Sequence, residues 1–268
     1  MAKIAAVSNQ KGGVGKTTVT INLGKNLASM GKRVLLIDND PQGNLTMAIF
    51  GDELPSEVVE WDGAGASSPG GSNGYNLYLE GVGVEPVAAS DNLHVIGASK
   101  HLSEISTKPF EVIFDFKEKI DALRQRYDYI LIDCLPSFGT LQTAAHMTAD
   151  YLVIPTHLDD FSVAGIDEQM KTANNTKRRL NPGLSLLGIL VNEVSSQRVL
   201  VEEHFYDRLA NQYGDYLFKT KITKSAKVKE SHAMRKSISE YKQNSDQARQ
   251  YMEFTKEFID RIEVGNEQ

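Results

Sequence analysis

The alternation of short apolar runs with longer amphipathic segments predicts a sheet of buried strands joined by helices. Several of the runs are apolar throughout, as expected when helices cover both faces of a parallel sheet. The predicted strands are residues 3–8, 33–38, 93–97, 129–133, 151–155 and 186–194. The predicted helices are residues 17–30, 109–126, 161–180, 199–213 and 245–264. This order predicts one α/β domain over residues 1–268, a doubly wound and mostly parallel sheet with helices on both faces.

Residues 61–83 break the rhythm. They contain seven glycines and little periodicity, which predicts a long, flexible insertion. A tolerated surface insertion and a partner-binding loop both fit this composition. A glycine-rich run outside a strand–helix context is a weak signal for phosphate binding, so no second phosphate site is predicted here.

Composition narrows the class of protein. Hydrophobic residues make up 41% and charged residues 24%, the balance of an ordinary globular protein. Cys134 is the only cysteine, so no intrachain disulfide can form, which is typical of a reducing cytoplasm. No signal peptide and no run of 18 apolar residues is recognisable, so no spanning helix is predicted. The net charge of −6 argues against a uniformly basic nucleic-acid binder but allows a local basic patch.

Residues 8–18, SNQKGGVGKTT, follow a predicted strand and open a predicted helix. Glycines let the backbone approach phosphate oxygens, and successive N–H groups at a helix N-terminus form an anion site. Lys16 is placed to neutralise the β- and γ-phosphates, and Thr17 offers a hydroxyl to Mg²⁺. The segment therefore predicts binding of ATP and Mg²⁺. The predicted contacts to the nucleotide are Gly12, Gly13, Val14, Gly15, Lys16, Thr17 and Thr18.

The loop departs from the pattern G-x-x-x-x-G-K-[ST] in two places. Gln10 stands where that pattern has its first glycine, and a second lysine follows at Lys11. Lys16 already supplies the charge that the phosphates of one nucleotide need. Lys11 is understandable if it points at phosphates held by another subunit.

Three segments resemble the ParA/MinD family of ATPases. KGGVGKTT resembles the family's deviant Walker A motif, in which the first lysine is the signature residue. Residues 36–44, LIDNDPQGN, resemble the D-x-D-P-Q-x-N switch of the ParA partition branch. Residues 129–137, YILIDCLPS, resemble the Walker B strand and second switch, with Leu135 in place of one of two usual prolines. The resemblance extends from Lys3 to about Ile262 and is weakest over residues 51–92.

The resemblance implies roles for four further residues. Asp40 would orient the attacking water, Asp38 would support the magnesium shell and Asp133 would hold Mg²⁺ through water. A carboxylate ending a buried strand beside a phosphate loop also suits a hard cation on physical grounds. Asn192 would contact adenine. The aspartates could instead cap helices or end strands in solvent, and Asn192 could simply form a turn.

The resemblance also implies a nucleotide-sandwich dimer in which each subunit contributes Lys11 to the other's ATP. Water would attack the γ-phosphate in line, and catalysis would rest on positioning and charge stabilisation by Lys11, Lys16 and Asp40. Slow turnover is expected, because a partner must complete the arrangement.

Residues 219–242 carry a local charge of +6, which could hold DNA phosphates without reading sequence. Lys224 and Lys227 match positions that contact DNA in the ParA branch, and Arg198 is a weaker candidate. A merely solvated face remains the alternative. The basic residues are Lys219, Lys221, Lys224, Lys227, Lys229, Arg235, Lys236 and Lys242, against the acids Glu230 and Glu240.

The C-terminal residues 253–268 have apolar positions at helical spacing but an acidic end. A MinD-like membrane helix would be basic, and an anionic membrane would repel this one. The segment is predicted to pack on the sheet, without a membrane partner. The resemblance thus implies a cytoplasmic, nucleoid-associated partition ATPase that forms a homodimer with ATP, binds DNA non-specifically and responds to a ParB-type centromere-binding protein. The alternatives are a positioning ATPase for non-DNA cargo and a MinD-like division-site regulator.

Overall fold

The structure is a computed structural model that describes residues 1–51, 54–56, 58 and 71–265. Within these residues the strands form one sheet in the order β3-β4-β2-β5-β1-β6-β7. All neighbouring pairs are parallel except β3 and β4. The strands are β1 (Lys3–Val7), β2 (Val34–Asn39), β3 (Val87–Ser90), β4 (Leu93–Ile96), β5 (Tyr129–Cys134), β6 (Tyr151–Thr156) and β7 (Ser185–Val191).

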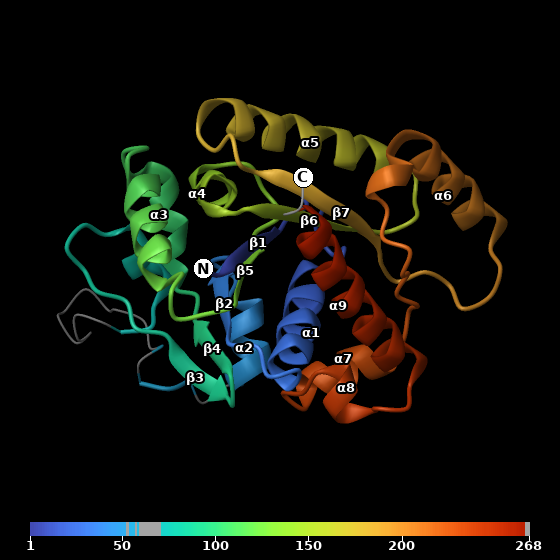
Figure 1. Ribbon diagram of the computed structural model, residues 1–268, viewed down its shortest axis with the longest axis horizontal. Helices are drawn as coiled ribbons and strands as arrows, with labels where there is room; N and C mark the ends of the chain where they lie inside the picture. Colours follow the sequence, from blue (N-terminus) through green and yellow to red (C-terminus); the bar gives the residue numbers. More distant parts are fainter. Residues whose placement is uncertain (52–53, 57, 59–70, 266–268) are drawn as a thin grey trace.

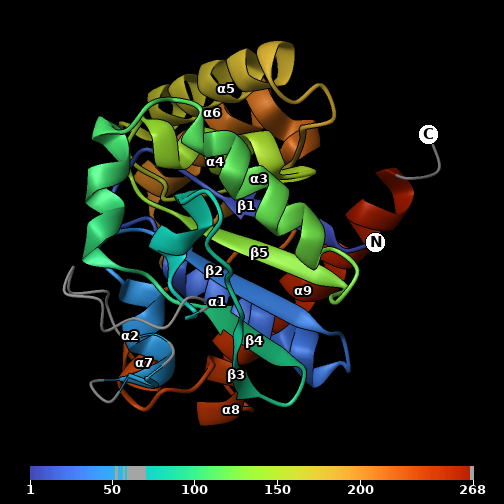
Figure 2. The same cartoon turned by 90° about the vertical axis from the view of Figure 1, so that its left-hand side faces the viewer.

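Helices cover both faces of the sheet (Figures 1 and 2). One face packs on α3, α4 and α5, and the other on α1 and α9, each around its own apolar cluster. The helices are α1 (Lys16–Ser29), α2 (Asn44–Phe50), α3 (Val112–Leu123), α4 (Thr140–Thr148), α5 (Ser162–Arg179), α6 (Leu200–Tyr213), α7 (Ala226–Ala233), α8 (Ile238–Tyr241) and α9 (Asp246–Gly265). Three 3₁₀ segments accompany them: η1 (Gly74–Tyr78), η2 (Lys100–Thr107) and η3 (Gly214–Tyr216).

The doubly wound fold predicted from the sequence is confirmed. Every residue of β2 and β5 is buried, which explains why their sequences are apolar without alternation. Helix α1 ends beside Gly31, whose φ of +79° allows the chain to turn out of the helix.

Helix α9 packs on the sheet, as its spacing of apolar residues predicts. Tyr251, Phe254, Phe258 and Ile262 are buried on one stripe of the helix. The ring of Phe258 lies 6.0 Å from that of Tyr129 on β5. No helix in the described part of the chain is long and apolar enough to cross a membrane.

The prediction of a flexible insertion at residues 61–83 is wrong for residues 72–78. Residues 72–78 are buried, and Tyr75, Leu77 and Tyr78 belong to the apolar cluster that also holds α3. The Tyr78 hydroxyl donates to Asn39 Oδ1 at the end of β2 (2.7 Å). The burial of these three large side chains outweighs the conformational freedom of the local glycines. Residues 61–70 lie outside the described residues.

Several short elements were not predicted. Strand β3 has too few residues for a clear pattern, and α2, α4, α7 and α8 are all shorter than ten residues. Strand β7 ends at Val191, three residues before the predicted boundary.

The two outer strands of the sheet, β3 and β7, both depart from a regular open edge. At one edge β3 pairs antiparallel with β4, and its register shifts between Ala88 and Ser90. At the other edge Ile189 of β7 forms an isolated bridge with Leu217.

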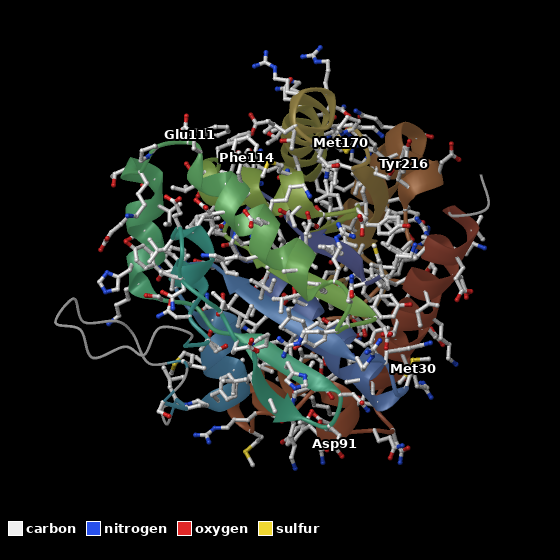
Figure 3. All side chains as sticks on the ribbon, turned by 60° about the vertical axis from the view of Figure 1, so that its left-hand side comes forward. Met30, Asp91, Glu111, Phe114, Met170 and Tyr216 are labelled. Atoms are coloured by element: carbon white, nitrogen blue, oxygen red, sulfur yellow. The ribbon has the colours of Figure 1, made fainter. Side chains whose placement is uncertain are left out.

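The loops that follow the parallel strands gather at the carboxyl ends of these strands, where open α/β folds bind ligands. Figure 3 labels residues at both ends of the strands. Met30 and Asp91 lie near the amino ends, and Glu111 and Phe114, at the start of α3, lie near the carboxyl ends.

Candidate functional site

The loop between β1 and α1 exposes backbone N–H groups. Gly13 and Gly15 have φ values of +76° and +86°, in the left-handed region that favours glycine. Gly15 is the N-cap of α1, and no side chain bonds the first turn. The first helical bond is donated by Val19 N–H to the Gly15 carbonyl (2.8 Å). The preceding N–H groups of the turn are therefore available to an anion.

Polar side chains hold this loop from behind. The amide of Asn9 donates to the Pro155 carbonyl at the end of β6 (2.8 Å), and its oxygen accepts from Lys11 N–H (2.9 Å). Gln10, which replaces the usual glycine, donates to Thr172 Oγ1 on α5 (3.2 Å). The unusual residue thus ties the loop to a helix of the opposite layer.

Lys16 lies across the loop rather than in solvent. Only 7% of it is exposed, and its Nζ donates to the Lys11 carbonyl (3.0 Å). Burial lowers the pKa of Lys16, while the nearby acidic groups, Asp133 foremost, act in the opposite direction. A buried ammonium at this position favours anionic ligands, because a second charge compensates its desolvation.

One buried carboxylate, that of Asp133, lies beside Lys16, and a second, that of Asp38, lies beside Asp133. Asp38 and Asp133 are register partners at the ends of β2 and β5. Thr17 Oγ1 donates to Asp133 Oδ2 (2.6 Å). Burial and then the charge of Asp38 raise the pKa of Asp133 well above its usual range, although Thr17 and Lys16 lower it. Two ionised carboxylates in this setting repel each other, and a divalent cation would relieve that repulsion.

The carboxylate of Asp38 also anchors helix α2. Its Oδ2 accepts from both the N–H and the hydroxyl of Thr46 (2.8 and 2.6 Å). Burial raises the pKa of Asp38 to about 6 despite these hydrogen bonds. Asp40, two residues later, accepts from Gln42 N–H (2.9 Å). Asp38 therefore holds the first turn of α2 through Thr46 and also lies beside Asp133.

Asn192 closes the other side of the loop. Its amide donates to the Val14 carbonyl (2.9 Å), and a Cβ added at Gly15 would lie 2.3 Å from that amide nitrogen. Among the described residues, its buried Oδ1 has no hydrogen-bond partner. A neighbouring cavity of about 60 Å³ is lined in part by Thr18 and Tyr251. An acceptor left unpaired at this depth is available to a ligand.

Lys11 forms an ion pair within its own chain. Its partner is Asp159 in the loop after β6, and its Nζ lies 6.0 Å from the centre of the Phe161 ring. Lys11 borders an open hollow of about 530 Å³. Phe138 and Phe161 line the same hollow, with 59% and 72% of each residue exposed.

The three DNA-contact candidates differ in environment. Lys224 and Lys227 are exposed, and Lys227 N–H bonds the N-cap Ser225 of α7. Arg198 is also exposed, but its Nε donates to Glu203 (2.6 Å).

The rest of the basic segment does not form one uniform face. Lys221 Nζ lies 3.2 Å from the centre of the Tyr206 ring. The guanidinium of Arg235 covers Gly51 at the end of α2. Some of the charges that the sequence counts together are therefore engaged in packing.

Sequence reasoning missed Thr46 and Asp159. Thr46 lies eight residues after Asp38 and belongs to no motif. Asp159 follows β6, and only the fold brings it to Lys11.

Comparison with known proteins places this geometry in a family. Residues 2–186 match the family described as AAA domain. The chain is 31% identical over 263 residues to the sporulation initiation inhibitor protein Soj of Bacillus subtilis, covering 96% of this chain and 98% of Soj. It is 30% identical over 261 residues to the chromosome partitioning protein ParA of Caulobacter vibrioides, covering 97% and 94%. Among solved structures, cobyrinic acid a,c-diamide synthase from Mycobacterium smegmatis with bound ATP analog and magnesium has a TM-score of 0.77 at 24% identity, covering 99% and 97%.

Proposed function

Since the chain belongs to the ParA/MinD-type family of P-loop partition ATPases, we propose that it is an ATP-dependent DNA partition ATPase. In this proposal ATP drives formation of a sandwich dimer, the dimer binds DNA non-specifically, and hydrolysis stimulated by a ParB-type partner releases it. One observation carries the proposal. A phosphate loop with two lysines keeps one of them, Lys16, buried over the loop and the other, Lys11, at an open face.

The loop is proposed to hold the triphosphate of ATP. Backbone N–H groups from Gly12 to Thr18 would surround the phosphates, and Lys16 would neutralise the β- and γ-phosphates. The left-handed glycines and the uncapped first turn of α1 fit an anion of this kind. The unpaired Oδ1 of Asn192 fits the exocyclic amino group of adenine, which is a donor.

The residues around Asp133 fit Mg²⁺. The described residues contain no group of three His, Cys, Asp or Glu side chains arranged around one point, so protein carboxylates alone would not enclose the ion. Thr17 would contribute its hydroxyl, and Asp133 would accept from the water shell. Asp38 would support that shell from β2. Bound Mg²⁺ would neutralise charge that develops on the phosphates.

Asp40 is proposed to orient the attacking water. Asp40 is the second aspartate of the switch that begins at Asp38, and its carboxylate accepts a backbone N–H from Gln42, which fixes its direction. In-line attack then depends on positioning by Asp40 and on charge stabilisation by Lys16 and by Lys11 of a second subunit.

The dimer is proposed to form across the hollow beside Lys11. The exposed rings of Phe138 and Phe161 are apolar surface of the kind that a partner covers. Lys11 would leave Asp159 and approach the phosphates of the other subunit. The γ-phosphate of ATP would thus stabilise the dimer, and its loss would weaken it.

DNA binding is proposed for Lys224 and Lys227, with Arg198 as a secondary contact. The first two are exposed beside the start of α7, where ammonium groups can reach phosphates. Arg198 would first have to leave Glu203.

DNA binding distinguishes this proposal from an ATPase that positions other cargo. A Lys224→Ala/Lys227→Ala variant should lose ATP-dependent DNA affinity, while the control Lys177→Ala, exposed on α5, should retain it.

The dimer is tested by size-exclusion chromatography with ADP and with a slowly hydrolysed ATP analogue. Wild type should double in mass with the analogue only, and Lys11→Ala should remain monomeric with both. Lys32→Ala, which removes an exposed lysine, is the control and should dimerise. Dimerisation of Lys11→Ala would contradict the proposal.

A further inference from the structure

A cluster of buried polar side chains lies directly behind the phosphate loop. Its centre is the hydroxyl of Ser8, the residue between β1 and the loop, which is fully buried. Ser8 Oγ accepts from the amides of Gln142 on α4 and Gln169 on α5, both at 3.0 Å. It lies 3.2 Å from His146 Nε2, also on α4. One hydroxyl therefore joins the loop to two helices of the opposite layer.

The directions of these hydrogen bonds can be assigned. Ser8 Oγ already accepts from two amides, so its own proton is left for one of two neighbours, His146 Nε2 or the Cys134 thiol on β5. Gln169 Nε2 also faces that nitrogen, at 3.3 Å. His146 Nε2 must therefore be an acceptor, and burial lowers the pKa of His146 to about 4, which keeps the ring neutral. Gln142 Nε2 additionally donates to Gln169 Oε1 (3.1 Å).

Helix α4 is the element through which this cluster reaches the reaction. It begins at Thr140, right after the loop 135–139 that follows Asp133 and β5. Gly139 at the junction has a φ of +145°, a conformation that glycine adopts readily. Gln142 and His146 are one turn apart near the start of the helix. A displacement of α4 along its axis would therefore move loop 135–139 relative to the phosphate loop.

The cluster is incompletely satisfied. Among the described residues, Gln142 Oε1 and His146 Nδ1 are buried without hydrogen-bond partners. Unpaired polar atoms at this depth have a free-energy cost, so the observed arrangement is less stable than a fully paired one. A shift of α4 that supplied those partners would therefore cost less free energy.

We infer that Ser8 is a positioning residue for ATP hydrolysis: its hydroxyl fixes α4, and through α4 the loop 135–139, in register with the phosphate loop. This inference rests on the proposed ATPase function. Ser8 contacts neither phosphate nor metal in this scheme, so its removal should affect the chemical step and not nucleotide binding.

The test compares Ser8→Ala with wild type by steady-state hydrolysis and by titration with ADP. The expected result is a fall in kcat of roughly 10- to 100-fold, the range for a small misplacement of catalytic groups, with the Kd for ADP within about twofold. Thr148→Val is the matched control. It removes another buried hydroxyl from the same layer and should leave kcat unchanged, because in the described part of the chain that hydroxyl bonds only the Ala144 carbonyl of its own helix (2.8 Å).

Gln142→Met carries the test independently, because it removes a donor to Ser8 from the α4 side and leaves the loop intact. Its kcat should fall similarly, and Ser8→Ala/Gln142→Met should be no slower than the slower single variant, since both substitutions remove one function. A folded Ser8→Ala or Gln142→Met with kcat within twofold of wild type would overturn the inference. So would a loss expressed only in the Kd for ADP. If wild type itself hydrolyses no ATP, the proposed function fails instead.

Discussion

Acid should destabilise this protein through His146, and the size of the effect follows from burial. The side chain is fully buried, and burial lowers its pKa from 6.5 to about 4. In the unfolded chain the imidazole is free to take up a proton near its ordinary pKa. Between pH 6.5 and about 4 the unfolded state therefore binds more protons than the folded state, and stability decreases as the pH falls through this window.

The magnitude can be worked out from the same two values. A displacement of about 2.5 pKa units corresponds to about 3 kcal/mol of unfolding free energy once the pH is below both pKa values. Between pH 7 and pH 5 the loss is about 2 kcal/mol. Asp38 acts in the opposite direction. Its pKa in the folded protein, about 6, lies above its ordinary value, so its contribution to the free energy of unfolding increases as the pH falls. A difference between two variants removes such shared contributions.

The assay is urea unfolding of wild type and His146→Gln at pH 7, 6 and 5. Gln at this position can still accept from Ser8 but does not titrate. The free energy of unfolding of wild type relative to His146→Gln should decrease by about 2 kcal/mol from pH 7 to pH 5. Thr148→Val, a buried substitution on the same helix, should run parallel to wild type at every pH. A wild-type–Gln difference that stays constant within about 0.5 kcal/mol would refute the reasoning.

Three further results are expected. Gly15→Ala should weaken ADP binding by more than about tenfold in calorimetry, because a Cβ there meets the Asn192 side chain at 2.3 Å in a left-handed backbone. Gly214→Ala, outside the phosphate loop and with open space around it, should bind ADP normally, and equal binding by the two variants would contradict the loop geometry. Phe258→Ala should reduce the free energy of unfolding by about 3–5 kcal/mol in urea titration. Phe114 is 54% exposed, so Phe114→Ala should reduce it by less than about 1 kcal/mol. A loss for Phe258→Ala as small as that for Phe114→Ala would mean that α9 is not part of the core. Asp38→Asn should abolish Mg²⁺-dependent hydrolysis and raise the melting temperature at pH 8, because it removes a buried carboxyl group whose pKa is already raised by burial. A lower melting temperature would show that the hydrogen bonds from Asp38 to α2 contribute more than the buried charge costs.

The sequence predicts the centre of this fold better than its periphery. Strands such as β5 are buried on both faces, so their apolar runs stand out without knowledge of their neighbours. Strand β3, half exposed and four residues long, has no comparable signal. The mistake at Tyr75 and Tyr78 has a physical cause. Glycines in a window indicate backbone freedom, while burial of large side chains nearby is decided by the rest of the fold.

The candidate site divides in the same way. Lys16, Thr17 and Asp133 follow from local motifs, and the structure brings them together. Asp159 lies 148 residues from Lys11, and their ion pair depends on the topology that places β6 beside β1. The cluster around Ser8 joins three elements through common residue types, so no spacing along the chain could reveal it.

The modified sheet edges limit the ways in which copies of this protein can assemble. A strand with free N–H and C=O groups along a regular edge offers a template on which another chain can extend the sheet. Here one outer strand is reversed and shifted in register at Ala88, and the other is already bridged at Ile189. Among the described residues, both outer strands are therefore poor templates for extending the sheet, and contacts between copies are expected on the faces that carry side chains and loops.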